Sequence, residues 1–313
     1  MISLAAKTAS IKEPKRSSAL VRQETIASYL FLLPSLIFFL GFVIYPMILC
    51  VVTSFFDSTM NRADIFVGFA NYAELFADPI FIGALRNTFI IVVVSVPVTC
   101  AFSLWVSSAI VDLPEWATSL FRCVFYLPVV TGSVAVTVVW KWMYNNYYGI
   151  FNYLGKAVGL IDKNINWLGD EKYALGCIIL ILLTTSVGQP IVLYVSALGN
   201  VDQSLIEAAQ VDGCTLLGAV FRVLIPVMLP SIVATGAYAF INAWNVYVYA
   251  TAFITDKAKY TLPLALNVFQ GEYGTDYGKL AAGCVIALIP VVVIFAFIQK
   301  HLSGGATSGA VKG

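Results

Sequence analysis

Charged residues are absent from six stretches of the chain, each at least 18 residues long. These stretches cover residues 25–56, 87–111, 123–140, 173–201, 223–255 and 280–299. An α-helix that crosses a bilayer needs about 20 mainly apolar residues, because each residue advances the helix by about 1.5 Å. The pattern therefore predicts an all-α integral membrane protein with six transmembrane helices.

The composition agrees with this prediction and argues against several functions. Of the 313 residues, 60% are hydrophobic and 11% are charged, whereas a soluble domain has about 25% charged residues. The net charge of +1 does not favour nucleic-acid binding. The six cysteines are scattered, mostly inside predicted spans, where they serve as small apolar residues rather than as disulfides or metal ligands. We expect no cofactor and no metal on this chain.

The chain also lacks the residues that drive transport in other systems. No charged residue lies in the middle of a predicted span, although proton-coupled carriers usually bury one there. The pairs Gly155–Lys156 and Gly278–Lys279 lack the spacing of a nucleotide-binding loop and its following Ser or Thr. ATP would therefore bind to a different polypeptide. A secondary carrier or channel for a small polar solute is the alternative function, and a membrane-embedded enzyme lacks the His and carboxylate clusters that it would need.

The orientation of the chain is decided only in part by its charges. Five basic residues precede the first span, which favours a cytoplasmic N-terminus under the positive-inside rule. Counted over all segments, however, nine basic residues fall on each side of the membrane. Tryptophans lie near the ends of the predicted spans, where they are typical of the membrane interface: Trp105, Trp116, Trp140, Trp142 and Trp167.

The connection between the fourth and fifth spans predicts a short helix, a turn and a second helix. Ser204 and Glu207 form a capping box that starts the first helix, which runs to about Val211. Gly213 then supplies a left-handed conformation, and the second helix runs into Pro226. We expect the first helix to expose small or apolar residues with charged edges: Leu205, Ala208, Ala209, Glu207 and Asp212. An amphipathic loop packed on its own bundle is the alternative.

This segment resembles the EAA loop of permease subunits in ATP-binding-cassette (ABC) importers. The motif reads EAA, three residues, Gly, nine residues, and then I-x-L-P. The chain has Glu207-Ala208-Ala209, Gly213 and Val223-Leu224-Ile225-Pro226, with two aliphatic replacements. The resemblance implies the type I ABC importer permease fold, with the loop in the cytoplasm and docked on a separate ATPase subunit. It implies these ATPase-coupling residues: Glu207, Ala208, Ala209, Asp212, Gly213 and Leu216.

Other segments resemble the carbohydrate-uptake branch, typified by the maltose permease pair. FLLPSLIFFLGFVIYP and GIFNYLG are similar to its larger permease, whereas YTLPLAL, DYGKLAAG and GATSGAVKG are similar to the smaller one. The resemblance implies a sugar or oligosaccharide substrate, although the residues leave another solute such as a glycerophosphate open. It also implies a second permease subunit in a heterodimer (self-pairing stays open), two ATPase subunits that bind ATP and Mg²⁺, and an extracytoplasmic solute-binding protein. The chain would lie among the lipids of a bacterial inner membrane.

The predicted organisation follows from these assignments. Residues 1–28 form a cytoplasmic N-terminal segment, and residues 29–302 form the six-span permease domain, with the coupling loop at about 200–228. Residues 303–313 form a cytoplasmic C-terminal tail.

The resemblance places substrate contacts on the fifth span, which contains AYAFINAWNVYVYA. Asn242 and Asn245 are three residues apart and share a helix face, where their amides offer donors and acceptors to solute hydroxyls. Because no proline follows Pro230 in this span, we expect the helix and its face to continue without interruption. Further substrate-binding candidates are Trp244, Tyr238 and Gln189. Hydrogen bonding between helices is the alternative role of the amides.

Overall fold

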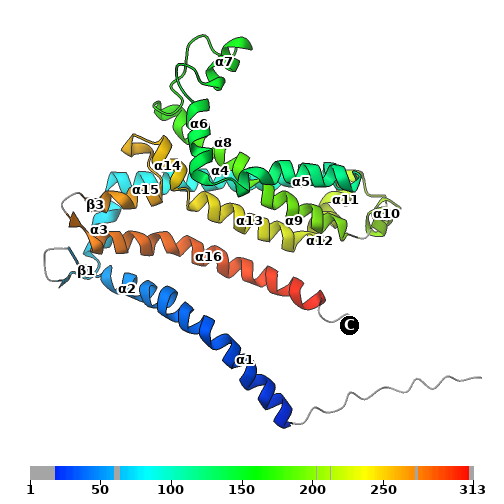
Figure 1. Ribbon diagram of the computed structural model, residues 1–313, viewed down its shortest axis with the longest axis horizontal. Helices are drawn as coiled ribbons and strands as arrows, with labels where there is room; N and C mark the ends of the chain where they lie inside the picture. The colour runs from blue at the N-terminus through cyan, green and yellow to red at the C-terminus, as the bar shows by residue number, and fades with distance from the viewer. Residues whose placement is uncertain (1–17, 60–63, 202, 212, 272–273, 310–313) are drawn as a thin grey trace, which may run out of the picture. The chain divides into compact units, whose positions relative to one another are not determined.

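The computed structural model describes residues 18–59, 64–201, 203–211, 213–271 and 274–309 (Figure 1). The chain divides into two compact units, residues 1–52 and 53–313, and each is described by itself. The first unit consists of three consecutive helical elements: α1 (Ser18–Phe39), the π-helical turn η1 (Leu40–Ile44) and most of α2 (Tyr45–Thr53). Its apolar run from Thr25 to Thr53 is long enough to cross a membrane.

Each of the two π-helical turns ends two residues before a proline. The turn η1 precedes Pro46, and η2 (Val220–Leu224) precedes Pro226. Ahead of Pro46, the N–H of Tyr45 donates to the carbonyl of Leu40, five residues back, and the equivalent bond precedes Pro226. The ring of a helical proline clashes with the carbonyl four residues earlier. The wider turn relieves that clash, so both prolines lie within continuous helix.

The second unit is almost entirely helical. Its elements after α2 are β1 (Phe56–Asp57), β2 (Ile65–Phe66), α3 (Ala70–Ala77), α4 (Pro79–Ile110), α5 (Glu115–Val130), α6 (Ser133–Met143), α7 (Ile150–Ala157), α8 (Glu171–Ser186), α9 (Gly188–Gly199), α10 (Gln203–Val211), α11 (Leu216–Ala219), η2, α12 (Ile225–Val227), α13 (Leu229–Trp244), α14 (Val248–Phe253), η3 (Lys257–Lys259), α15 (Leu262–Leu266), η4 (Asn267–Phe269), β3 (Gln270–Gly271), β4 (Gly274–Thr275) and α16 (Tyr277–Gly309). The strands form two small antiparallel hairpins, β1 with β2 and β3 with β4.

The predicted spans are built in two ways. In this unit α4 and α16 are single helices long and apolar enough to cross a membrane. Three other spans are bent pairs: α5 and α6 meet at 95°, α8 and α9 at 44°, and the helices on either side of Met228 at 70°. Together with the helix of the first unit, they make six candidate spans if each bent pair counts as one. Figure 1 shows α6 and α7 projecting away from the long helices α4, α5 and α13.

Helix α4 lies at the centre of this unit, packed against α8, α9 and α13. Its buried face repeats a small hydroxyl side chain every four residues: Ser95, Thr99, Ser103 and Ser107. Ser107 Oγ donates to the carbonyl of Ile191 at 3.1 Å, and Ser103 Oγ donates to that of Val187 at 3.4 Å. Val187 is the residue between α8 and α9, so α4 satisfies a main-chain oxygen at this interruption.

The start of α9 lies close against α5 at Gly188. A Cβ atom at this position would lie 2.4 Å from the carbonyl oxygen of Phe125 and 2.9 Å from the Cα of Tyr126. Main-chain atoms cannot move aside as a side-chain end can, so only glycine fits between the two helices.

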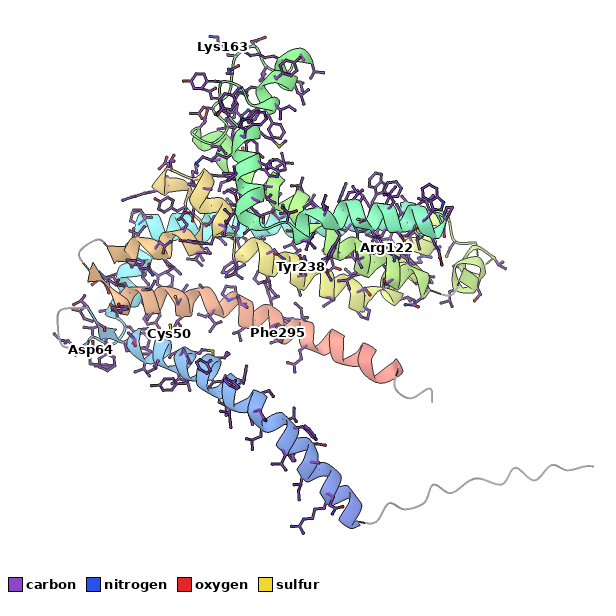
Figure 2. The ribbon with its side chains drawn as sticks, in the orientation of Figure 1. Cys50, Asp64, Arg122, Lys163, Tyr238 and Phe295 are labelled. Atoms are coloured by element: carbon purple, nitrogen blue, oxygen red, sulfur yellow. The ribbon has the colours of Figure 1, made fainter. Side chains whose placement is uncertain are left out.

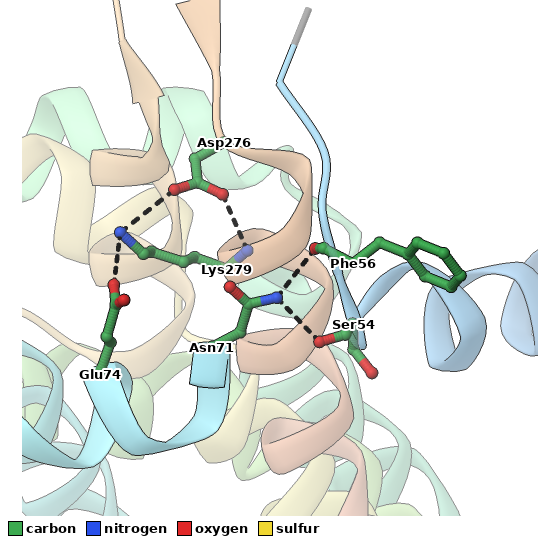
Figure 3. A network of polar contacts seen from close by, with 6 residues as sticks. All are labelled: Ser54, Phe56, Asn71, Glu74, Asp276 and Lys279. Atoms are coloured by element: carbon green, nitrogen blue, oxygen red, sulfur yellow. Dashed lines mark hydrogen bonds and ion pairs between the residues drawn. The ribbon is translucent and has the colours of Figure 1, made fainter. Parts of the chain in front are cut away.

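An ion-pair network holds the first turn of α16 (Figure 3). Lys279 Nζ lies 2.8 Å from Glu74 Oε2 on α3 and 3.3 Å from Asp276 Oδ2. Asp276 Oδ1 also accepts the main-chain N–H of Lys279 at 3.0 Å. These contacts join the DYGKLAAG segment to α3.

An amide beside this network ties α3 to the chain after α2. Asn71 Nδ2 donates to the carbonyls of Ser54 and Phe56, both at 2.9 Å (Figure 3). A Cβ at Gly278 would lie 2.2 Å from the carbonyl oxygen of Phe56 and 2.9 Å from Asn71 Nδ2. Glycine at this position therefore lets α16 approach both groups.

Candidate functional site

A cavity of about 410 Å³ lies where three helix interruptions come together. The interruptions fall between α5 and α6, between α8 and α9, and between α13 and α14. The lining residues lie in or beside them: 128–133, Leu182, Thr185, Ser186, Tyr238, Asn242 and 245–249. Inside a membrane, irregular main chain is tolerated where it is buried in protein or lines a water-filled cavity. This cavity is therefore the candidate site for a solute.

Three of the five predicted substrate residues line this cavity: Tyr238, Asn242 and Asn245. Their spacing of four and then three residues places them on one face of α13 and its C-terminal cap. Asn242 is half-buried and Asn245 is exposed. Figure 2 shows Tyr238 on α13. Both amides thus lie at the same cavity, as sequence reasoning expected.

The helix does not continue past them, so the expectation of an uninterrupted fifth span is wrong. Helix α13 ends before Asn245, whose φ and ψ are −94° and 28°. The main-chain N–H of Tyr247 donates to the carbonyl of Asn245 at 2.8 Å. Thr261 Oγ1 donates to the carbonyl of Val246 at 3.3 Å, and Asn267 Nδ2 donates to the hydroxyl of Tyr247. Thr261 and Asn267, which come later in the chain, therefore stabilise a helix break that no nearby proline or glycine predicts.

Four polar side chains of the cavity each donate one hydrogen bond to their own helix. Asn242 Nδ2 donates to the carbonyl of Tyr238 at 2.8 Å, and Asn245 Nδ2 donates to that of Ile241 at 3.1 Å. The hydroxyls of Thr131 and Thr185 likewise donate to carbonyls four residues earlier, at 2.9 and 2.8 Å. An amide or hydroxyl oxygen keeps acceptor capacity in such an arrangement. The lining therefore favours solutes that donate hydrogen bonds.

The cavity carries no ionic group within the described part of the chain, since none of its lining residues is Asp, Glu, Lys, Arg or His. No cluster of three or more His, Cys, Asp or Glu side chains that could hold a metal ion occurs among the described residues either.

Two other predicted substrate residues lie outside this cavity. Trp244 is 4% exposed, and its Nε1–H donates to the carbonyl of Ala287 on α16 at 3.1 Å. Its ring stacks on Phe240 at 5.6 Å between centroids, so it packs α13 against α16. Gln189 is half-buried in the first turn of α9 and does not line the cavity.

Sequence reasoning missed the polar side chains that the other two interruptions contribute. These are Thr131, Ser133, Thr185 and Ser186. Pro128 and Gly132 signal a weak point in the third span, but a local signal does not reveal which helix faces come together.

The predicted turn of the coupling loop has the expected geometry. Gly213 has a φ of +85°, which confirms the left-handed conformation. The N–H of Cys214 donates to the carbonyl of Ala209, five residues back, at 2.9 Å. This bond is characteristic of a Schellman motif, in which a glycine ends a helix and the next residue satisfies one of its last carbonyls.

The first helix of the loop differs from expectation in two details. It starts at Gln203, so Ser204 lies inside the first turn rather than at the cap. Leu205 is 45% exposed and Ala208 is exposed, but Ala209 is 7% exposed. Adjacent helix residues point about 100° apart, and Ala209 faces inward where α10 packs on α11 and η2. Of the other coupling candidates, Asp212 and the side chains of Glu207 and Leu216 lie outside the described residues.

Comparison with known proteins gives concordant matches. The family model described as "binding-protein-dependent transport system inner membrane component" matches residues 24–307. The lactose transport system permease protein LacF of Rhizobium radiobacter is 30% identical over 289 residues, which is 91% of this chain and 96% of LacF.

Two solved structures share the fold. A chain from the crystal structure of a bacterial alginate ABC transporter in complex with an alginate pentasaccharide-bound periplasmic protein has a TM-score of 0.74 at 20% identity, covering 91% of this chain and 96% of that one. A chain from a bacterial ABC transporter involved in the import of the acidic polysaccharide alginate has a TM-score of 0.73 at 19% identity, covering 94% and 100%.

Proposed function

This chain belongs to the family of inner membrane components of binding-protein-dependent transport systems, and we propose that it forms the membrane path for an uncharged sugar or oligosaccharide. It has the six-span type I ABC importer permease fold expected from the sequence. Its family role is that of a transport subunit, and relatives named as sugar permeases support a carbohydrate substrate. The alternative of a secondary carrier or channel is not favoured.

The observation that carries the choice of substrate is the uncharged cavity at the three helix interruptions. Lactose, named for one relative, is neutral, whereas alginate, named for the structural neighbours, is acidic. A buried carboxylate needs a cation or several donors to replace its hydration. The described residues that line this chain's half of the transport path include no cation. Their oxygens accept hydrogen bonds from hydroxyl groups. These features favour a neutral polyhydroxylated solute.

We further propose that α10 and the turn at Gly213 dock on an ATPase subunit, which holds ATP and Mg²⁺. The rigid Schellman turn and the exposed Leu205 and Ala208 support this role. A complete importer would contain a second permease, two ATPase copies and an extracytoplasmic binding protein, with both termini of this chain in the cytoplasm. The neighbour in complex with a periplasmic protein supports this assembly.

The substrate proposal is tested with the complete importer reconstituted in vesicles. Uptake is measured for a panel of neutral mono- to trisaccharides, and for lactose beside lactobionate as a matched neutral and acidic pair. We expect uptake of a neutral sugar. We expect Asn242→Leu and Asn245→Leu each to lower its transport efficiency about fivefold, because each loses hydrogen bonds worth about 1 kcal/mol.

Thr251→Val is the matched control. Thr251 Oγ1 makes the same type of bond, to the carbonyl of Tyr247 at 2.9 Å, but does not line the cavity. Its uptake should match the unaltered importer. Import of acidic sugars alone would refute the choice of substrate, and unchanged uptake in both asparagine variants would reduce these amides to packing residues.

A further inference from the structure

Arg122 lies on α5 (Figure 2), and no other described residue supplies it with a counter-ion. It is the only charged residue between Glu115 and Lys141. Its Nε is buried and has no hydrogen-bond partner, and no ion pair joins Arg122 to another described residue. Arg122 as a whole is half-buried, but a guanidinium does not lose its charge in proteins, and an N–H that is buried without a partner is costly. An anionic group from outside this chain would satisfy it.

Arg122 borders a second cavity, of about 290 Å³, formed by the end of α4, the start of α5 and the end of α9. Ser119 lies one turn before Arg122 on the same helix face and also lines it. Thr118 is not available to a ligand as a donor, because its hydroxyl donates to the carbonyls of Ile110 and Leu113 at 2.9 and 3.2 Å. The cavity thus offers an anion one guanidinium and one hydroxyl.

The wall opposite α5 leaves room for a ligand. It is formed by Val195 and Gly199 on α9, and a Cβ added at Gly199 would meet nothing within 4 Å.

Glu115 gives the cavity a negative end. It lines the same cavity seven residues before Arg122, about 10 Å away along the helix. The two side chains form no ion pair with each other or with another described residue, so an unpaired carboxylate and an unpaired guanidinium line the same cavity. A zwitterionic group can satisfy both, with its anion at Arg122 and its cation at Glu115.

Apolar side chains that neighbour the lining residues in the sequence are exposed. Leu113, which lines the cavity, is 39% exposed, and Trp116 and Leu120 on α5 are 73% and 55% exposed. A tryptophan at the end of a membrane span is typical of the interface with lipid headgroups. Exposed apolar side chains suit lipid acyl chains, whereas they contribute nothing to the binding of a free inorganic ion.

We propose that this cavity binds the headgroup of phosphatidylethanolamine. Its phosphate oxygens accept hydrogen bonds from the guanidinium of Arg122 and the hydroxyl of Ser119, and its primary ammonium donates to the carboxylate of Glu115. Arginine matches phosphate geometry with two parallel donors. Phosphatidylglycerol offers no cation to Glu115, and the quaternary ammonium of phosphatidylcholine has no N–H to donate. The site borders the chain that leads from α9 into α10.

The assembled importer is reconstituted in vesicles of phosphatidylcholine with equal minor fractions of phosphatidylethanolamine and phosphatidylglycerol. It is then extracted in mild detergent, and the retained lipid is identified by native mass spectrometry. We expect retained phosphatidylethanolamine, and at least about tenfold less of it in Arg122→Gln, since hydrogen bonds to charged groups contribute about 1.5–3 kcal/mol. Glu115→Gln should lose the preference for phosphatidylethanolamine over phosphatidylglycerol while still retaining lipid.

Arg86→Gln is the matched control, because Arg86 is an exposed arginine near the other end of α4 and should not affect retention. Equal retention in Arg122→Gln and the unaltered importer would overturn the proposal, as would a preference for phosphatidylglycerol. A separate arm adds inorganic phosphate to delipidated importer. Thermal stabilisation that requires Arg122, without lipid retention, would identify a free-phosphate site instead. If the Arg122→Gln importer fails to assemble, the lipid preference of the Glu115→Gln importer tests the proposal. An unchanged preference for phosphatidylethanolamine in that variant refutes it.

Discussion

The turn at Gly213 allows a direct test of how the coupling loop works. The added Cβ of Gly213→Ala would meet no atom within 4 Å, so it causes no clash. The φ of +85° is the only obstacle, because an L-residue in the left-handed region is strained. Gly213→Ala should therefore disturb the path of the main chain after α10 without disturbing any packed neighbour, and Gly213→Val should add to the same strain.

The size of the effect follows from that strain. A left-handed conformation costs an L-residue roughly 1–2 kcal/mol, which corresponds to a factor of about 5–30 in the population of the native turn. The cost for valine should lie at the upper end of this range because valine is β-branched, whereas asparagine tolerates the left-handed conformation. We expect affinity for the ATPase subunit to fall about five- to thirtyfold in Gly213→Ala, further in Gly213→Val, and least in Gly213→Asn.

The assay is a binding titration of the purified ATPase subunit against the permease pair in detergent, with sugar uptake measured in parallel. Gly236→Ala on α13 is the matched control: an added Cβ there also meets nothing within 4 Å, but its φ is not positive. If Gly213→Asn binds as poorly as Gly213→Val, main-chain conformation is not the cause. If all three variants bind normally, the loop does not couple this chain to the ATPase.

Three further predictions concern single residues. Gly278→Ala should destabilise the protein by about 1–3 kcal/mol, measured as a lower Tm in detergent, because its Cβ would lie 2.2 Å from the carbonyl of Phe56. Trp244→Phe loses the bond to Ala287 and should cost about 0.6–1.7 kcal/mol in a denaturation series, while sugar uptake stays unchanged because Trp244 is outside the cavity. Cys214 should react with a membrane-impermeant maleimide in inside-out vesicles, and reaction from the external face alone would contradict a cytoplasmic loop.

The features that could be predicted from the sequence are those that local chemistry decides. A run without charged residues predicts a membrane helix because an ionised group in the hydrocarbon core is costly. The left-handed Gly213 is likewise local: a helix that must end offers its last carbonyls, and glycine is the residue that adopts the required φ. That Asn242 and Asn245 lie on one face of α13 and its cap followed from their spacing of three residues.

The tertiary structure decided which of these residues meet. The break after α13 depends on Thr261 and Asn267, which supply hydrogen bonds from a later segment, so the sequence around Asn245 carries no sign of it. Trp244 points toward α16 because its indole N–H donates to the carbonyl of Ala287, which lies 43 residues later in the sequence. The cavity itself exists because three interruptions, separate in sequence, come together around α4 and α13. Hydrogen-bond partners between distant segments are set by helix packing, and periodicity along a single helix does not encode them.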